Sequence, residues 1–208
     1  MPPQEADTEG RIFEAALRVF AAKGFHGARM QEIADAAGIN KALLHYYFRS
    51  KEGLYGEVFR YVFGMFVQSL GTALRAQTDG SFAVTLRTFV DGYLDFLGAH
   101  PDVPRLLVGE MLAGGAFARQ HIGAIVSEGG PAEQLMFSRI RQAVERGEIR
   151  PVDPRHLVLT VIGACVFPLI ARPMASMLIP EIETDFPAYL QQRKDEVFYL
   201  LYEGLARR

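Results

Sequence analysis

The sequence has few of the features that mark secreted or membrane-spanning proteins. It contains one cysteine, Cys165, so no disulfide can form within the chain, and a single thiol is typical of a reducing compartment. The longest apolar stretch, 156–171, contains Pro168 and is shorter than the ~20 residues that a membrane-spanning helix needs. The N-terminus is polar and shows no apolar signal segment. These absences predict a cytoplasmic protein.

Motifs for nucleotide binding and nucleophilic catalysis are missing as well. No two glycines stand two residues apart, which excludes a GxGxxG loop, and neither a Gly-Lys pair nor a GxSxG element occurs. His100 and His121 belong to no short metal-binding motif, and nothing pairs Cys165 with a base. The sequence therefore predicts no enzyme, no cofactor and no metal. A helical enzyme is the alternative, and it would need titratable side chains clustered in a cleft.

Positive charge is concentrated near the N-terminus, although the whole chain carries a net charge of -2. Between residues 18 and 51 only Glu32 and Asp35 oppose the lysines and arginines, which leaves a local excess of four positive charges. The remainder of the chain must be acidic. A basic tip on an acidic body is common in proteins that touch phosphate at one end. The cations of this segment are Arg18, Lys23, Arg29, Lys41, Arg49 and Lys51.

Apolar residues recur every three to four positions throughout, which predicts an all-α protein. Thr8 is the expected N-cap of the first helix, and Gly24 its left-handed end. Asn40 and Ser50 are expected to cap the third and fourth helices. A longer fourth helix then leads into a C-terminal helical bundle. The predicted helices are 8–24, 30–37, 41–48, 51–77, 82–98, 102–113, 117–127, 131–147, 154–171 and 186–206.

The segment QEIADAAGINKALLHYYFRSKEGL has the pattern of a helix-turn-helix. Two short helices are separated by a glycine turn, and small residues (Ala34, Ala37 and Gly38) allow them to cross closely. The positions predicted to point inward are Ile33, Ala34, Ala37, Ile39, Leu44 and Phe48. The positions left outward on the third helix are Lys41, Ala42, His45 and Tyr46, with Leu43 and Tyr47 on its flanks. Such an outward set suits the DNA major groove.

The run GFHGARMQEIADAAGINKALLHYYFRSKEGLYGEV resembles the DNA-binding domain of the tetracycline-repressor (TetR) family over about residues 8–60. IADAAGI, YYF and SKEGLY are its most specific parts. Carried over by position, the resemblance implies base contacts from Gln31, Lys41, Ala42 and His45. It implies phosphate contacts from the Leu43 backbone, Tyr46, Tyr47 and Lys51. Arg29 replaces the usual Thr or Ser cap, so a cap is lost and a cation that can reach phosphate is gained.

Simpler interpretations stand beside these roles. Tyr46 and Tyr47 could be packing aromatics, and Lys41 and Lys51 could be solvated surface lysines. His45 occupies a position where tyrosine is frequent in the family, which leaves the base preference open. Residues 1–60 are predicted to form the DNA-binding domain, with the helix-turn-helix at 29–48.

By resemblance, residues 61–208 form a bundle that dimerises and binds a small molecule, most simply releasing a repressor from a palindromic double-stranded operator. The alternative is a ligand-independent architectural DNA-binding protein with a filled interior. The apolar residues of helices 154–171 and 186–206 are predicted to form a homodimer contact: Leu157, Val161, Ile162, Val166, Tyr189, Val197, Leu200, Leu201 and Leu205. A pocket for a hydrophobic effector is predicted to be lined by Phe89, Tyr93, Phe96, Leu107, Met111, Ile162 and Cys165.

Overall fold

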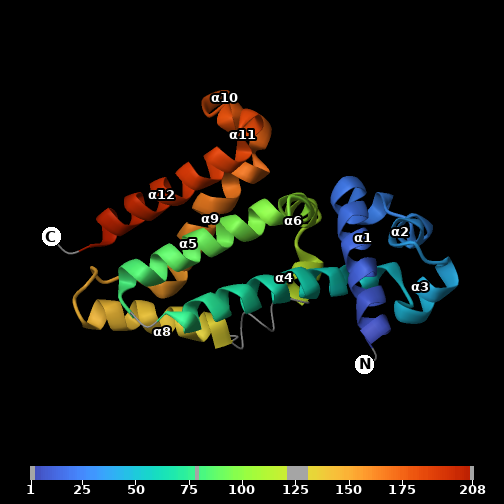
Figure 1. The fold of residues 1–208 in the computed structure, drawn as a ribbon, viewed down its shortest axis with the longest axis horizontal. Coiled ribbons are helices and arrows are strands. Elements are labelled where there is room, and N and C mark those ends of the chain that lie inside the picture. The colour runs from blue at the N-terminus through green and yellow to red at the C-terminus, as the bar shows by residue number, and fades with distance from the viewer. Residues whose placement is uncertain (1–2, 78–79, 121–130, 207–208) are drawn as a thin grey trace. The chain divides into compact units, whose positions relative to one another are not determined.

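The computed structural model describes residues 3–77, 80–120 and 131–206, and it confirms the all-α prediction (Figure 1). Within these ranges, extended pairing is limited to one isolated bridge between Ile149 and Ala206. The helices are α1 (Pro3–Gly27), α2 (Met30–Ala37), α3 (Lys41–Tyr47), α4 (Lys51–Ala76), α5 (Phe82–Ala99), α6 (Asp102–Leu112), α8 (Pro131–Glu145), α9 (Pro154–Ile170), α10 (Arg172–Leu178), α11 (Glu181–Thr184) and α12 (Phe186–Leu205).

Two helix predictions differ from the structure. The first helix begins at Pro3, ahead of the Thr8 cap that we expected, and it continues to Gly27 beyond a kink at Gly24. Gly24 has a positive φ of 66°, but its ψ of 175° is extended rather than left-handed helical. The segment between α9 and α12, which we took as a break, contains α10 and α11, which are too short to show periodicity. Of the helix expected at 117–127, residues 121–127 lie outside the described residues.

The predicted caps of the helix-turn-helix are present. The Asn40 side chain accepts a hydrogen bond from Leu43 N at 2.7 Å, and Ser50 Oγ accepts one from Gly53 N at 3.0 Å. Gly38 ends α2 in the left-handed conformation (φ 68°), where its N–H bonds back to the α2 carbonyls. Arg29 makes no capping bond, as the sequence indicated. Hydrogen bonds between residues close in sequence therefore define the end of α2 and the starts of α3 and α4.

The chain divides into two compact units. The first, which we call the head unit, comprises Met1–Met65 and Pro101–Glu128, and the second, the bundle unit, comprises Phe66–His100 and Gly129–Arg208. Helix α6, which we expected in the second domain, packs instead against α1 in the head unit. The predicted inward residues Ile33, Ala34, Ala37, Leu44 and Phe48 are all buried there. Only Ile39 of that set is partly exposed.

In the bundle unit, α5 packs against α8, α9 and α12, and its buried stripe includes Leu86, Phe89, Val90 and Leu94. Asp153 caps α9: its carboxylate accepts bonds from Arg155 N at 2.9 Å and from the Arg155 guanidinium at 2.6 Å. That guanidinium lowers the pKa of Asp153 to about 2.

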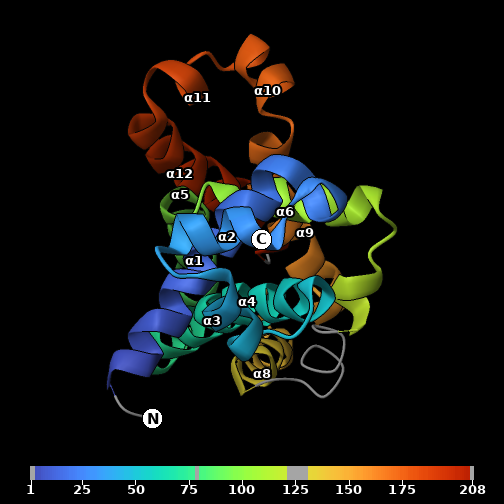
Figure 2. The same ribbon diagram turned by 90° about the vertical axis from the view of Figure 1, so that its right-hand side faces the viewer.

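Between α9 and α12, the short helices α10 and α11 form a projection (Figure 2). Arg172 holds its base, because its guanidinium pairs with Glu183 at 2.8 Å and lies over the Phe186 ring. Met177 and Leu178 are largely exposed on α10. Within the described ranges, no single helix is long and apolar enough to cross a membrane, and α9 with α10 reaches that length only as a pair bent by 90°.

Candidate nucleic-acid interface

Helix α3 presents a polar face on a buried anchor. Leu44 and Phe48 are buried in the head unit, and this fixes the rotation of the helix. Lys41, Ala42 and His45 are exposed as predicted, and Tyr46 is 81% exposed. A side chain this open makes few packing contacts, so the packing interpretation of Tyr46 loses its support. The remaining face offers an ammonium group, an imidazole and a phenol, which are groups that contact bases and phosphates.

Tyr47 and Leu43 flank that face. Tyr47 is half-buried, with its ring 5.7 Å from Tyr46 and 6.3 Å from Phe48. Its body therefore packs on the head unit, as the packing interpretation held. Leu43 is partly exposed, and its backbone N–H is already bonded to the Asn40 side chain. A phosphate at this backbone position would have to share or replace that bond.

The N-terminal turn of α2 carries two of the other predicted contacts. Arg29 and Gln31 are exposed, and Gln31 Nε2 donates to Asp35 Oδ1 at 2.7 Å. Glu32, which would repel a phosphate, is paired with Lys23 at 2.9 Å, and this pair lowers the pKa of Glu32. Gln31 would therefore have to release the Asp35 carboxylate before its side chain could reach a base.

Lys51 has internal partners that the sequence did not reveal. Its ammonium donates to the Ala28 carbonyl at 3.1 Å and to the His26 carbonyl at 3.5 Å, and it lies 4.6 Å from the centre of the Phe25 ring. These partners precede Lys51 by 23 to 26 positions, so no local pattern could indicate them. Lys51 thus ties the start of α4 to the connection between α1 and α2. If Lys51 also contacts a phosphate, its ammonium must do so while it keeps or gives up its bonds to these carbonyls.

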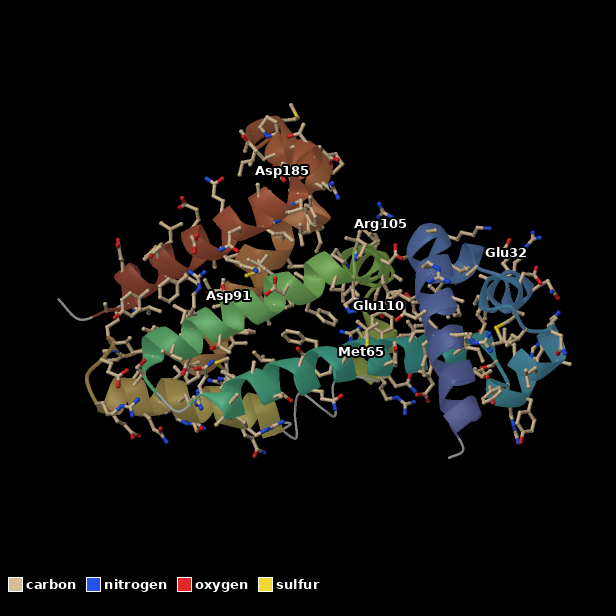
Figure 3. All side chains as sticks on the ribbon, viewed as in Figure 1. Glu32, Met65, Asp91, Arg105, Glu110 and Asp185 are labelled. Atoms are coloured by element: carbon tan, nitrogen blue, oxygen red, sulfur yellow. The ribbon has the colours of Figure 1, made fainter. Side chains whose placement is uncertain are left out.

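Helix α6 carries a buried carboxylate, Glu110, in the head unit (Figure 3). Glu110 is 2% exposed, and its Oε1 accepts bonds from Phe117 N at 2.8 Å and from Ala118 N at 3.1 Å. Burial raises the pKa of Tyr55, and the nearby charge of Glu110 raises it further. The Tyr55 ring lies 5.1 Å from both Phe25 and Phe117. In sequence, Glu110 looked like any surface charge of an amphipathic helix.

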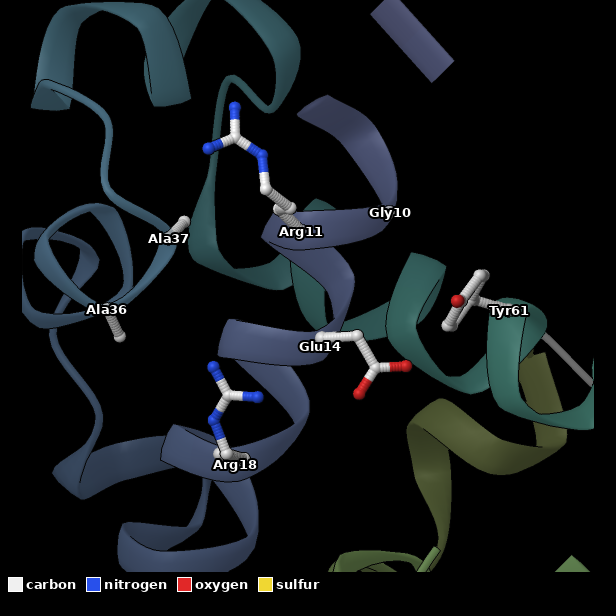
Figure 4. Close-up of a pocket in the computed structure, with 7 residues that line it drawn as sticks. All are labelled: Gly10, Arg11, Glu14, Arg18, Ala36, Ala37 and Tyr61. Atoms are coloured by element: carbon white, nitrogen blue, oxygen red, sulfur yellow. The ribbon is translucent and has the colours of Figure 1, made fainter. Parts of the chain in front are cut away.

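An open hollow of about 480 Å³ lies beside the helix-turn-helix (Figure 4). Arg11 and Arg18 stand on α1, and the Glu14 carboxylate between them points towards Tyr61. A Cβ placed on Gly38 would lie 4.0 Å from Arg11 Nη1, so this guanidinium borders the turn that leads into α3. Sequence reasoning missed Arg11. The sequence pattern that could have indicated it is the spacing of seven residues from Arg18, which places both arginines on the same polar face of α1.

The residues assigned to an effector pocket are divided between the two units. Phe89, Tyr93 and Cys165 are buried in the bundle unit, with Phe96 and Ile162 partly buried nearby in sequence. Phe66 of α4 adds its ring to this aromatic cluster, 4.9 Å from Tyr93 and 5.3 Å from Phe96. Leu107 and Met111 belong to the head unit instead, and Met111 is 70% exposed. Exposure of that degree does not suit the wall of an enclosed pocket.

The interior next to Phe89 is nearly filled. An enclosed apolar cavity of about 10 Å³ is lined by Phe89 together with Thr85 of α5, and by residues of α8 and α9. This is about the space of one water molecule. Among the described residues, no three His, Cys, Asp or Glu side chains converge as metal ligands would. An effector of drug size does not fit into this cavity as it stands.

Together, the short capped α2 and α3, the polar face of α3 and its buried anchors define a helix-turn-helix DNA-binding protein. Comparison with known proteins agrees. The model of bacterial regulatory proteins of the tetR family matches residues 12–58, and that of the tetracyclin repressor-like C-terminal domain matches residues 83–198. The chain belongs to the TetR family, and it is a DNA-binding transcriptional regulator.

Similar proteins of this family come from several bacteria. The HTH-type transcriptional regulator RutR of Escherichia coli K12 is 32% identical over 72% of this chain and 68% of its own. The HTH-type transcriptional repressor NicS of Pseudomonas putida is 30% identical over 79% and 77%. The regulator FadR of Bacillus subtilis, solved in complex with stearoyl-CoA, has the same fold, with a TM-score of 0.73 at 19% identity over 94% and 98% of the two chains.

Proposed function

We propose that this protein is a ligand-responsive repressor, which binds a palindromic operator as a homodimer and is released by a small, largely hydrophobic effector. The observation that carries the proposal is the open polar face of α3, fixed by Leu44 and Phe48. The similarity to NicS, a repressor, supports repression, and the fold shared with FadR, which was solved with stearoyl-CoA, supports a bound small molecule.

In the proposed complex, α3 enters the major groove. Lys41, Ala42 and His45 face base edges, and Gln31 joins them when it releases Asp35. Arg29, Tyr46 and Tyr47 contact phosphates, and Leu43 does so through its backbone. Lys51 acts at the edge of this surface, where it stabilises the head unit through Ala28 and can approach a phosphate at the N-terminus of α4.

Two alanine variants separate base reading from phosphate contact. His45→Ala should relax sequence preference at one base pair, with a loss of about 1–3 kcal/mol of discrimination. Lys51→Ala should weaken binding to all sequences alike and reduce the slope of log affinity against log salt by about one. Affinities for an operator and its single-base variants, measured at several salt concentrations, would decide this. A Lys51→Ala protein that keeps the wild-type salt slope but loses stability would leave Lys51 with its structural role only.

We further propose that α9 and α12 form the dimer contact, through Leu200 as the sequence suggested and otherwise through side chains that the sequence did not single out. Leu157, Val161, Tyr189, Val197 and Leu205 are buried within the subunit, so they are not available to a partner. The exposed apolar side chains are Leu159 and Phe167 on α9, and Tyr199 and Leu200 on α12. Leu159, Gly163 and Phe167 recur every four residues, and so they form one stripe. A palindromic operator requires such a twofold contact.

A charge placed on this stripe tests the dimer. Phe167→Glu should convert the protein to monomers at micromolar concentration, because a carboxylate would be buried without a partner in the contact. Molar mass from light scattering, with Met177→Glu as the control, gives the answer. Met177 is exposed on the projection outside the proposed stripe. A Phe167→Glu protein that stays dimeric and binds its operator normally would place the contact elsewhere.

For the effector, we propose a site built around Phe89, Tyr93, Phe96, Ile162 and Cys165 of the bundle unit. A ligand shifts the operator equilibrium only when it prefers one conformation to the other. The small cavity beside Phe89 offers such a preference, since a ligand that enters there must separate α5 from α8 and α9.

A further inference from the structure

Helices α9 and α12 are linked by an arginine at a proline. Pro168 lies inside α9 and has no N–H, so the carbonyl of Ala164, four residues earlier, loses its helical donor. Arg193 of α12 replaces that donor, because its Nη2 lies 2.7 Å from the Ala164 oxygen. This bond fixes the guanidinium in the interior between the two helices.

The fixed guanidinium leaves donors without acceptors. Arg193 Nε is buried and has no hydrogen-bond partner. One turn earlier on α12, Tyr189 is 2% exposed, and its hydroxyl is buried and unpartnered as well. The positive charge of Arg193 opposes the rise that burial causes in the pKa of Tyr189 and of Cys165, which shows that the three groups are close together.

The neighbouring charges of α12 do not compensate Arg193. Lys194 is paired with Asp95 at 2.5 Å, and Asp195 with Arg87 at 2.6 Å. Among the described residues, no carboxylate forms an ion pair with Arg193. The buried Nε–H of Arg193 and the buried hydroxyl of Tyr189 lack acceptors, which is unfavourable, and a bound anion would satisfy both.

We propose that Arg193 and Tyr189 bind the carboxylate of the effector, whose apolar body lies against Tyr93, Cys165 and Phe89. A guanidinium beside a phenol offers a positive charge and two donors to two oxygens, which suits a monocarboxylate. The inference rests on the proposed function, and it narrows the effector to a small carboxylic acid with an apolar chain or ring. The neutral amide of the same acid lacks the charge that Arg193 requires.

The test measures thermal stability of the full-length protein with straight-chain carboxylates from acetate to octanoate, each beside its primary amide. Carboxylates should raise the melting temperature of the wild type more than their amides, with the effect growing with chain length. Tyr189→Phe removes one oxygen atom, and Arg193→Gln removes the positive charge. Each variant should bind the carboxylates at least tenfold more weakly than the wild type does, so that the preference over the amides is lost. Arg141→Gln, which makes the same change at an exposed position of α8, should keep it.

Equal effects of carboxylates and amides on the wild type, including no effect of either, would overturn the proposal. So would an unchanged preference in Tyr189→Phe, whose fold can be checked by circular dichroism even if Arg193→Gln fails to fold. Operator binding without ligand is measured on the same proteins. If the wild type binds no operator but still prefers carboxylates, then the proposed function fails and the carboxylate site stands. If the wild type binds its operator but shows no preference for carboxylates, then the carboxylate site fails and the proposed function stands.

Discussion

Replacing Glu110 by alanine is expected to lower the free energy of unfolding by about 3 kcal/mol, because Phe117 N and Ala118 N would lose their common acceptor inside the head unit. The loss should also weaken operator binding. Glu110 adjoins Tyr55, whose ring contacts Phe25, and Phe25 lies under the Lys51 ammonium that holds the entry to α2. Urea denaturation followed by circular dichroism measures the first effect, and operator titration measures the second.

Two matched variants make this result specific. Glu110→Gln keeps an acceptor oxygen at the same place, so it should retain more than half of the stability that alanine loses. Glu203→Ala removes an exposed carboxylate from α12 and should change the free energy of unfolding by no more than about 0.5 kcal/mol. If Glu110→Ala were as stable as Glu203→Ala, the buried carboxylate would not support the head unit in the way its hydrogen bonds indicate.

Leu44→Ala should be damaging to a similar degree, with a loss of about 2–5 kcal/mol in the free energy of unfolding. Leu44 is fully buried, and it is the anchor that holds the short α3 on α2. An isolated helix of seven residues has no stability of its own, so α3 should lose its fixed position when this anchor is cut back. Operator binding should then fall below detection at temperatures where the bundle unit is still folded.

The neighbouring leucine is the natural control. Leu43 lies on the same turn of α3 but is 37% exposed, and its proposed phosphate contact uses the backbone. Leu43→Ala should therefore leave stability and operator affinity almost unchanged. Equal losses from the two substitutions would mean that α3 is rotated from the orientation described, and the assignment of Lys41, Ala42 and His45 to the groove would fall with it.

The sequence determined the parts of this protein that depend on residues close together in the chain. The caps at Asn40 and Ser50 and the turn at Gly38 are formed by hydrogen bonds that span a few residues. The same holds for the two faces of α3, since helical periodicity alone places Leu44 inward and His45 outward. The class of protein followed from that segment, because the polar face and its anchors lie within one short stretch.

Only the tertiary structure decided the roles that depend on distant partners. Lys51 was expected to be free for phosphate, but Ala28 and Phe25 occupy its ammonium. On α12, Val197 and Leu200 are equally apolar, and nothing local shows that Val197 is buried within the subunit while Leu200 is left exposed. The sequence around Arg193 does not distinguish it from an exposed surface arginine. Its role arises because a proline in another helix leaves a carbonyl without a donor at the point where α12 passes.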